Sequence, residues 1–363
     1  MRFQGFQNGW QEKILEEIIT SIVSGKTTPS TTGVFPVYGS MGIIGFCDIP
    51  THKGKYLLIA RVGANAGSIN NVEGEFSATD NTLILGVKEN ISINFLYQKL
   101  LSYNLNKLIF GSGQPLITGG ELKCLKLFFP EITEQSKIAR LLNFIDDRIS
   151  TQSQIIKKLQ SLIKGLSEKL YTQEVRFPEF KGKWDTKLGG EIFKRHSNKH
   201  HYSDLPIVAV TKNKGVAKRE DIDYNITVED KSIQSYKVIE KGDFVISLRS
   251  FEGGIEYSEI TGICSPAYTI LKSQIPIVDN FYKAYLKRSS YIALLNERIE
   301  GIRDGKNISF ENFSIIPLPY PTISEQNKIA NFLSAIDEKL EIEKQILKKY
   351  TEQKKYLLAN MFI

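Results

Sequence analysis

One stretch of the sequence comes close to a motif that binds nucleoside phosphates. "TSIVSGKTT" at 20–28 contains the Gly-Lys-Thr that ends the pattern G-x-x-x-x-G-K-[ST], whose glycines let backbone amides wrap a phosphate. The pattern requires a first glycine at position 20, and the chain has Thr20 there. Because the loop lacks that glycine, we interpret the stretch as an ordinary loop that enters a folded domain.

A second stretch, "KRHSNKHHY" at 194–202, gathers histidines. His196 and His200 stand at i and i+4, a spacing that suits two metal ligands, yet no cysteine or acidic residue completes a known ligand set. With His201 and the neighbouring lysines, the stretch is more typical of a basic surface loop. The N/D-P-P-Y/F signature of adenine methyltransferases is absent, and no Cys–His or Ser–His arrangement stands out. The residue types therefore favour binding over catalysis.

The 363-residue chain has the composition of an ordinary globular protein, with 41% hydrophobic and 24% charged residues. Its three cysteines, Cys47, Cys124 and Cys264, form no C-x-x-C, which favours reduced thiols in the cytoplasm. The chain contains no run of about 18 apolar residues, as a membrane span requires, and its N-terminus has no signal sequence. The net charge of +7 is compatible with a polyanionic partner, but the surplus is spread thinly along the chain.

Internal repeats give the chain its organisation. "PEITEQSKIARLLNFIDDRIS" at 130–150 returns as "PTISEQNKIANFLSAIDEKLE" at 321–341, and 14 of 30 positions are identical when the two copies are aligned without gaps from their prolines. An opening R-F-x-x-F-x-x-x-W-x-x-K-[IL]-x-x-E-I also occurs twice, 174 positions apart. Since the repeated features keep their order, we predict a tandem duplication of one unit, roughly 1–172 and 173–363.

Each repeated segment predicts a long amphipathic helix. Thr133 and Ser324 suit the N-cap position, and Glu134 and Glu325 follow in the first turn, where the positive helix end favours a carboxylate. Apolar residues then recur in an a/d heptad pattern over about four repeats, which is typical of a coiled coil. Helices of about 38 residues, roughly 57 Å long, are too long for an ordinary domain and need a partner. We expect the two copies to pack antiparallel within one chain; the alternative is a homodimeric coiled coil.

The segments before each helix have the pattern of globular domains with mixed structure. Short β-branched and aromatic runs such as "KYLLIARV" and "DFVISL" predict strands, and turn signals interrupt them without a βαβ rhythm. The expected fold class is therefore α/β (α+β): two globular domains joined by two long helices in an antiparallel coiled coil, as a tandem duplication with pseudo-two-fold symmetry. We place the globular domains at 1–129 and 176–320 and the helical segments at 130–175 and 321–363.

The proline followed by "ITEQSKIARLLNFIDDRI", with "RFPEFKGKW" opening the next unit, resembles the specificity (S) subunit of type I restriction–modification systems. The likeness covers the entire chain and includes "TTPSTTGVFPVYGSMGIIG", "GSGQPLITGGELKCLKL" and "YKVIEKGDFVIS…GICSPAY". The second globular domain shows no clear counterpart of "TTPSTTGVFPVYG". The repeated helix start is the more specific part of the resemblance.

This resemblance implies a non-catalytic DNA-recognition subunit without a cofactor or metal of its own. The domains 1–129 and 176–320 are implied to be target recognition domains, each reading one half of a bipartite target in double-stranded DNA. The segments 130–175 and 321–363 are implied to be a helical spacer that sets the gap. Two methyltransferase (M) subunits using S-adenosylmethionine, and restriction (R) subunits using ATP and Mg, are the implied partners, with no membrane involved.

Two alternatives stay open at this point. The first is an adaptor that uses two globular modules and a coiled coil to assemble proteins without DNA. The second is the specificity subunit of a modification-only system, which acts without a restriction subunit. Retention of duplex DNA in a gel-shift assay, with and without methyltransferase subunits, separates the adaptor from the DNA-binding interpretation.

Candidate DNA contacts follow from what the ligand requires. Base edges are read by forked or amide donors, and phosphates are bound by cations and backbone amides. Arg61 and Arg249 end equivalent strands of the two repeats and precede glycine-containing loops. The alternative is that each arginine pairs with a neighbouring carboxylate and only holds the fold. The candidates are Tyr38, Ser40, Lys53, Arg61, Asn65 and Gln114 in the first domain, and Lys212, Asn213, Lys214, Arg249, Arg303, Lys306 and Asn307 in the second.

Overall fold

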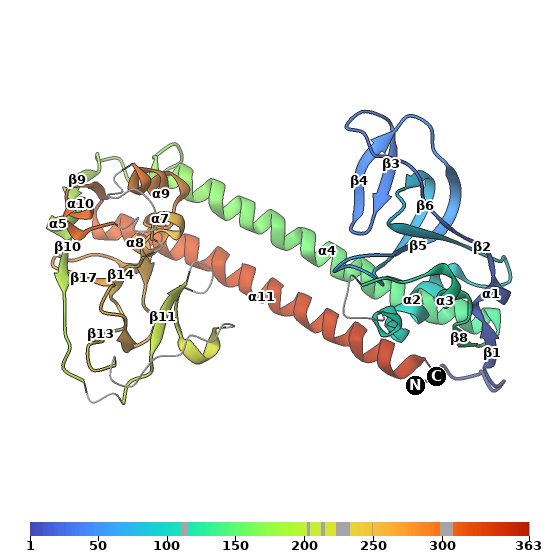
Figure 1. Cartoon of the computed structure of the whole chain (residues 1–363). Coiled ribbons are helices and arrows are strands. Elements are labelled where there is room, and N and C mark those ends of the chain that lie inside the picture. Colours follow the sequence, from blue (N-terminus) through green and yellow to red (C-terminus); the bar gives the residue numbers. More distant parts are fainter. Residues whose placement is uncertain are drawn as a thin grey trace. The chain divides into compact units, whose positions relative to one another are not determined.

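The computed structural model divides the chain into two compact units (Figure 1). Unit 1 comprises Met1–Gln154 and Lys344–Ile363, and unit 2 comprises Ile155–Glu343. The long helices α4 (Ile132–Tyr171) and α11 (Ile323–Met361) each contribute one part to each unit. The structure describes residues 1–109, 115–201, 204–211, 215–222, 233–248, 250–297 and 308–362.

The globular part of unit 1 is built around a six-stranded sheet with the strand order β2-β7-β5-β6-β3-β4. Neighbouring strands run antiparallel except β3 and β6, which are parallel. Side chains from this sheet and from helix α2 share one apolar core with the start of α4. In chain order the elements are β1 (Gln11–Ile14), α1 (Leu15–Ile18), β2 (Ile19–Ser24), β3 (Phe35–Gly39), β4 (Gly42–Cys47), β5 (His52–Ala60), β6 (Ile69–Ala78), β7 (Thr82–Val87), α2 (Ile93–Tyr103), the 3₁₀ helix η1 (Leu105–Leu108), α3 (Gly119–Lys123) and β8 (Lys126–Phe129).

The globular part of unit 2 has a four-stranded sheet in the order β10-β17-β14-β15 and several two-stranded pairs. Its apolar core joins this sheet to α8 and to the start of α11. In chain order the described elements are β9 (Asp185–Leu188), α5 (Gly189–Ile192), β10 (Phe193–His196), β11 (Val208–Thr211), β12 (Gly215–Lys218), η2 (Arg219–Asp221), β13 (Lys237–Ile239), β14 (Phe244–Ile246), α7 (Ser250–Gly253), β15 (Glu256–Tyr257), β16 (Gly262–Cys264), β17 (Thr269–Ser273), α8 (Asp279–Tyr285), α9 (Ser289–Asn296), α10 (Phe310–Ser314) and β18 (Pro317–Tyr320).

The two units repeat one order of elements. The antiparallel pair β1–β8 in unit 1 corresponds to β9–β18 in unit 2, and its first strand leads directly into a four-residue helix, α1 or α5. The strands β2, β7 and β5 are neighbours in the same sequence as β10, β17 and β14. The expected tandem duplication and mixed α/β fold are therefore confirmed.

An ion pair with a buried carboxylate joins the beginning of each unit to the start of its long helix. Glu134, at the start of α4, has a fully buried side chain, and both its oxygens accept hydrogen bonds from the Arg2 guanidinium at 2.8 Å. In unit 2 Arg176 donates in the same way to Glu325 of α11, at 2.8 and 2.9 Å. The arginine that opens the R-F-x-x-F segment and the glutamate of the repeated E-Q pair are therefore partners, which explains why the two motifs recur together.

The glutamine of the E-Q pair forms a hydrogen bond with the start of a second helix in each unit. The side-chain amide of Gln135 donates to Pro130 O at 2.9 Å, and its oxygen accepts the backbone N–H of Ser92 at 3.0 Å. The Ser92 hydroxyl in turn caps α2 by accepting the N–H of Phe95. Gln326 repeats the arrangement with Pro321 and with the N-cap residue of α8, Val278. Each glutamine thus satisfies backbone groups that would otherwise be buried without partners.

Within each unit the two long helices run antiparallel. In unit 1 the apolar residues Leu357 and Met361, near the end of α11, pack in the core with Ile138 and Leu142 near the start of α4. In unit 2 Leu170, near the end of α4, packs in the core formed with the start of α11. Because each seam is filled by the other helix of the same chain, the intramolecular arrangement is confirmed over the homodimeric alternative.

Aromatic rings pack together in each core, near the end of α11 in unit 1 and near the end of α4 in unit 2. In unit 1 the Trp10 ring lies 5.9 Å from Phe95 and 6.4 Å from Phe362, measured between ring centroids. In unit 2 Trp184 and Tyr171 lie 6.1 and 4.9 Å from Phe281. The tryptophan of the repeated opening motif therefore packs on the matching phenylalanine in both units, Phe95 or Phe281, and edge-to-face packing of such rings contributes beyond their apolar area.

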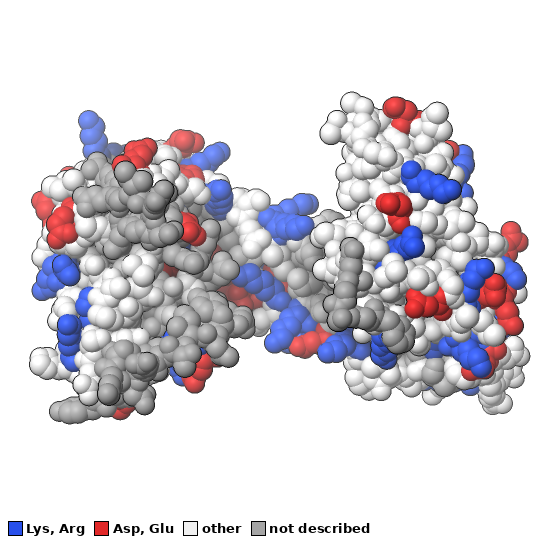
Figure 2. All heavy atoms as spheres, viewed as in Figure 1, with Lys and Arg blue, Asp and Glu red and all other residues white. Residues whose placement is uncertain are grey.

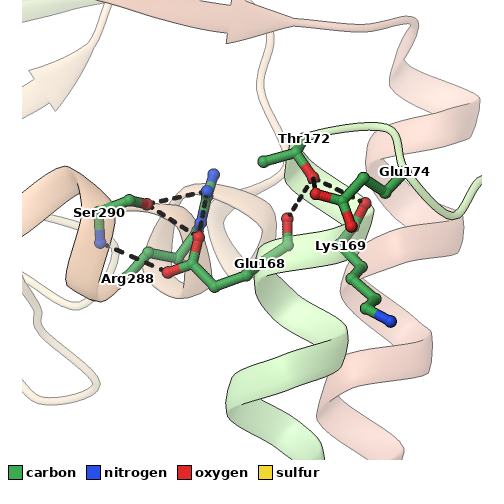
Figure 3. A network of polar contacts seen from close by, with 6 residues as sticks. All are labelled: Glu168, Lys169, Thr172, Glu174, Arg288 and Ser290. Carbon is green, nitrogen blue, oxygen red and sulfur yellow. Dashed lines mark hydrogen bonds and ion pairs between the residues drawn. The ribbon is translucent and has the colours of Figure 1, made fainter.

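Unit 2 has a polar network between the end of α4 and the start of α9. Figure 3 shows Glu168 of α4 beside Arg288 and Ser290 at the start of α9, with its carboxylate bonded to Arg288 Nε at 3.0 Å and Ser290 Oγ at 2.9 Å. Burial raises the pKa of Glu168, but the hydrogen bonds from Arg288 and Ser290 outweigh it and lower that pKa overall. In unit 1 Ser102 Oγ of α2 donates to Leu358 O of α11 at 2.8 Å.

The Gln135 contacts generate a stability prediction. Gln135→Met removes both hydrogen bonds and leaves a buried N–H and a buried carbonyl, so the free energy of unfolding should fall by about 2–4 kcal/mol. Urea denaturation measures this change. Gln154→Met is the matched control, because Gln154 is exposed on the same helix and its substitution should cost less than about 0.5 kcal/mol. Equal effects of the two substitutions would contradict the role of Gln135.

A buried lysine generates a pH prediction. Lys99 is 5% exposed, and its Nζ lies 5.5 and 5.3 Å from the ring centroids of Trp10 and Phe362. Burial lowers the pKa of Lys99 from 10.5 to about 8. The unfolded chain keeps this proton up to a higher pH than the folded chain. The buried charge of Lys99 therefore destabilises the folded state most strongly below pH 8, and this effect disappears as the pH approaches 10.5.

The free energy of unfolding should therefore gain about 2–3 kcal/mol from this group as the pH rises through that window. The Lys99→Met chain should lack the gain, which urea titrations of both proteins between pH 7.5 and 10.5 would reveal. Parallel pH curves for the two proteins would show that Lys99 is not the source.

Candidate nucleic-acid interface

The structure describes five of the thirteen predicted DNA-binding residues, all in unit 1. Tyr38, Ser40, Lys53, Arg61 and Asn65 lie on strands β3 and β5 or in the loops that follow them. The remaining predictions lie outside the described residues: Gln114, Lys212, Asn213, Lys214, Arg249, Arg303, Lys306 and Asn307.

Arg61 follows β5 directly and is the best-placed cation of the set. Its backbone N–H donates to Asn81 O at 2.9 Å, and its carbonyl accepts from Ile117 N at 2.8 Å, so the main chain is held on both sides. The side chain forms no ion pair with any residue that the structure describes, and its buried Nε has no hydrogen-bond partner. Because a buried donor without a partner costs free energy, this guanidinium is suited to an external acceptor. The alternative of a carboxylate partner receives no support here.

Two threonines join Arg61 at the turn between β6 and β7. Thr79 and Thr82 are buried, and neither side-chain hydroxyl has a hydrogen-bond partner. Thr82 pairs with Ala60 in the sheet, next to Arg61, and its N–H donates to Thr79 O at 3.1 Å. Three unsatisfied polar side-chain atoms therefore belong to one small region of the fold. The sequence analysis missed the threonines because "SATDNT" has the composition of an ordinary turn.

The loop after β5 carries Asn65. Gly63 and Gly67 adopt left-handed φ values of 77° and 86°, which non-glycine residues rarely adopt, and they bracket a tight turn around Asn65. The N–H of Gly63 donates to Pro115 O at 3.1 Å, which ties the loop to the segment before α3. Asn65 is half-buried and lies in the loop that begins at Arg61.

Tyr38 lies in the same region through its backbone, and a DNA contact by its side chain stays a prediction. The carbonyl of Tyr38 accepts the N–H of Thr79 at 2.9 Å, so β3 and Arg61 are bonded to one turn. The Tyr38 ring lies edge-to-face on Phe76 with 5.8 Å between centroids. Ser40 follows in the turn that connects β3 to β4 and is half-buried.

Lys53 forms an ion pair on the surface of the sheet. Its Nζ lies 2.9 Å from Glu75 Oε1, across the β5–β6 pairing, and Lys55 forms a similar pair with Glu73 at 3.2 Å. The Lys53 side chain is 81% exposed, so the pair contributes little to stability. A DNA contact by Lys53 stays a prediction.

The described residues offer no metal site, and one of the three thiols, that of Cys264, is buried. No group of three or more His, Cys, Asp or Glu side chains there is arranged to hold a metal ion. His201, from the histidine stretch, places Nε2 3.2 Å from Tyr236 O. Burial raises the pKa of Cys264 to about 12, so this thiol stays protonated. None of the described helices combines the length and apolar character that crossing a bilayer requires.

A family model described as Type I restriction modification DNA specificity domain matches residues 7–161 and 183–352. The chain belongs to this family. The two matches follow the two sequence repeats, so each copy of the duplicated unit carries the specificity domain. The resemblance drawn from the repeated helix start is confirmed.

Curated relatives of this family carry the same name. The chain is 36% identical to the type I restriction enzyme EcoprrI specificity subunit of Escherichia coli over 113 residues, which cover 31% of this chain and 28% of that protein. It is 27% identical over 263 residues to the putative MjaX specificity subunit of Methanocaldococcus jannaschii, covering 68% and 60% of the two chains. The chain therefore matches less than two thirds of the length of both relatives.

A solved structure agrees over the full length. The S subunit of the type I restriction–modification system of M. genitalium superposes with a TM-score of 0.68, covering 100% of this chain and 99% of that one. Since the two sequences are 18% identical, the likeness shows a shared fold.

The unpartnered guanidinium generates a binding prediction. Arg61→Gln should weaken binding to the cognate duplex about tenfold, because a forked contact to a base or phosphate is lost. The melting temperature should change little, since no described residue forms an ion pair with Arg61. Fluorescence anisotropy with a labelled duplex measures the first effect and calorimetry the second.

Lys55→Gln is the control for this measurement. Lys55 stands on the same strand as an exposed cation paired with Glu73, and its substitution should change affinity less than about twofold. A loss in the Arg61 variant no larger than in this control would remove Arg61 from the interface.

Proposed function

We propose that the chain is the DNA specificity subunit of a type I restriction–modification enzyme. The observation that carries the proposal is the double match of the specificity-domain family, once in each of two units with the same element order. In this proposal residues 1–129 and 176–320 are target recognition domains that each read one half of a bipartite duplex sequence. The segments 130–175 and 321–363 form the spacer that sets the gap between the halves.

The long helices also offer a surface for partner subunits. Several large apolar side chains on them are exposed rather than packed against the chain itself. Phe144 is 53% exposed on α4, and Ile342 and Tyr356 are 56% and 58% exposed on α11. Apolar residues of this size on a helix surface support docking of other proteins. We assign them to two methyltransferase subunits, with restriction subunits joining the assembly.

The proposed subunit recognises DNA without catalysis of its own and acts in the cytoplasm. Methyl transfer from S-adenosylmethionine is assigned to the methyltransferase subunits, and ATP hydrolysis with Mg to the restriction subunits. The support is membership of the specificity-domain family together with the unpartnered polar groups around Arg61, which are suited to binding.

Methylation-aware sequencing tests this function. Cells that carry this chain and its methyltransferase partner should show a bipartite adenine-methylated motif, and the motif should vanish when the gene for this chain is deleted. Exchanging residues 1–129 for those of a homologue should change one half of the motif and leave the other half and the gap unchanged. Exchanging 176–320 is the reciprocal control, because it should change only the other half.

Two results would contradict the proposal. A motif that survives deletion of the gene would show that specificity resides elsewhere. Methyltransferase subunits that co-purify with the chain in a complex without any sequence-dependent DNA retention would favour the adaptor alternative.

A further inference from the structure

The last strand of the unit 1 sheet exposes an apolar surface. Strand β4 lies at the edge of the six-stranded sheet and forms an antiparallel hairpin with β3. Ile43 and Ile44 on this strand are 56% and 50% exposed, and Met41 in the turn is 80% exposed. Edge strands normally carry charges that prevent unwanted pairing. This one carries none.

The lack of charge extends over the whole neighbourhood of the hairpin. Between Lys26 and Asp48 the sequence contains no Lys, Arg, Asp or Glu. In Figure 2 the surface over β3 and β4 is accordingly almost entirely white. Exposed apolar surface of this kind marks a contact site, because scattered single residues are normal whereas a contiguous group is not. The hairpin is therefore suited to contact apolar groups of a partner.

The position of the hairpin in the fold indicates what that partner is. The carbonyl of Tyr38 in strand β3 accepts the backbone N–H of Thr79, and Asn81 in the same turn accepts the backbone N–H of Arg61. The apolar surface therefore lies next to the candidate DNA interface. A two-stranded β ribbon also has the width that the major groove of DNA admits.

Unit 2 contains the counterpart of this hairpin. Strand β3 lies parallel to β6 in unit 1, and Ile207, which precedes β11, forms a parallel bridge with Ile263 of β16 in unit 2. Strands β11 and β12 then pair antiparallel, as β3 and β4 do. The three residues between them in the sequence are Lys-Asn-Lys, residue types that bind phosphates and base edges. The same hairpin position thus exists in both copies of the duplicated fold, with different residues on its strands.

We propose that the β3–β4 hairpin reads thymine in the first half-site, with Ile43 and Ile44 packing on its 5-methyl group in the major groove. The inference rests on the proposed function and says which chemical group of the DNA the β3–β4 hairpin contacts. The thymine methyl is the apolar feature that distinguishes a T·A pair at the groove edge. An isoleucine that covers it favours thymine by burying the methyl and offers no hydrogen-bond partner to cytosine.

Replacing thymine by deoxyuridine tests the contact, because deoxyuridine lacks only the methyl group. The full chain with its methyltransferase partner is titrated with duplexes that contain the methylated motif. Each thymine of the half-site that depends on residues 1–129 is replaced in turn. At one position or more the affinity should fall about threefold to fivefold, the effect of one buried methyl group.

The Ile43→Ser, Ile44→Ser double variant should bind the thymine and deoxyuridine duplexes equally. Val23→Ser is the matched control and should keep the wild-type difference, because Val23 is 45% exposed on β2 at the opposite edge of the same sheet. Circular dichroism melting confirms that both variants fold, as expected for substitutions of exposed side chains.

Three outcomes would overturn the inference while leaving the proposed function intact. They are equal wild-type affinity for every deoxyuridine duplex, a half-site without thymine, and retained discrimination in the double variant. Loss of the methyltransferase subunits from the double variant, with discrimination unchanged, would assign the surface to a protein partner instead. Absence of any motif-dependent binding would overturn the proposed function and this inference together.

Discussion

The ion pair between Arg2 and Glu134, repeated as Arg176 and Glu325, is the constraint on which each unit depends. A carboxylate without solvent exposure is costly unless a cation pairs with it and its oxygens accept hydrogen bonds. The cation comes from the opening segment of the unit, and the carboxylate comes from the helix that follows about 130 to 150 residues later. The whole globular part between them must therefore fold so that its two ends meet. Loss of the arginine would leave the buried carboxylate without its cation, so the two ends of the unit have to stay together.

The framework around this pair is the same in both units, whereas the elements attached to it differ. The tryptophan, the phenylalanine of α2 or α8, and the glutamine clamp occupy matching places. Lys99 and Tyr285 occupy the same position relative to that phenylalanine, so one core contains a buried cation and the other a ring. Outside the framework, unit 1 has a continuous six-stranded sheet and unit 2 a set of smaller ones. Duplicated domains that recognise different ligands should diverge in this way, because only the framework is restricted by packing.

Sequence reasoning predicted the parts of the fold that are encoded locally or repeated. The long helices follow from heptad spacing, and the recurrence of the E-Q pair pointed to the duplication before any contact was known. The partner of Glu134 could not be read from the sequence, because a glutamate in the first turn also suits the helix dipole alone. Lys53 and Arg61 also looked equivalent, because the sequence does not show which cation faces a carboxylate in the folded sheet. Only the β5–β6 register placed Glu75 opposite Lys53, and it gave Arg61 no carboxylate partner among the described residues.

The hairpin in unit 2 was missed because its sequence does not resemble that of β3 and β4, and the reason is physical. In unit 1 the hairpin is attached to the sheet through backbone pairing, Val37 with Ser77 and Tyr38 with Ala78, and through the carbonyl of Tyr38. Backbone hydrogen bonds do not depend on which side chains face the solvent, so the outer residues of β4 are free to change without loss of the fold. The hairpins β3–β4 and β11–β12 can therefore carry different side chains at one position of the duplicated fold. Variation at that position alters what is contacted, while the backbone pairing of β3 with β6 keeps the hairpin in place.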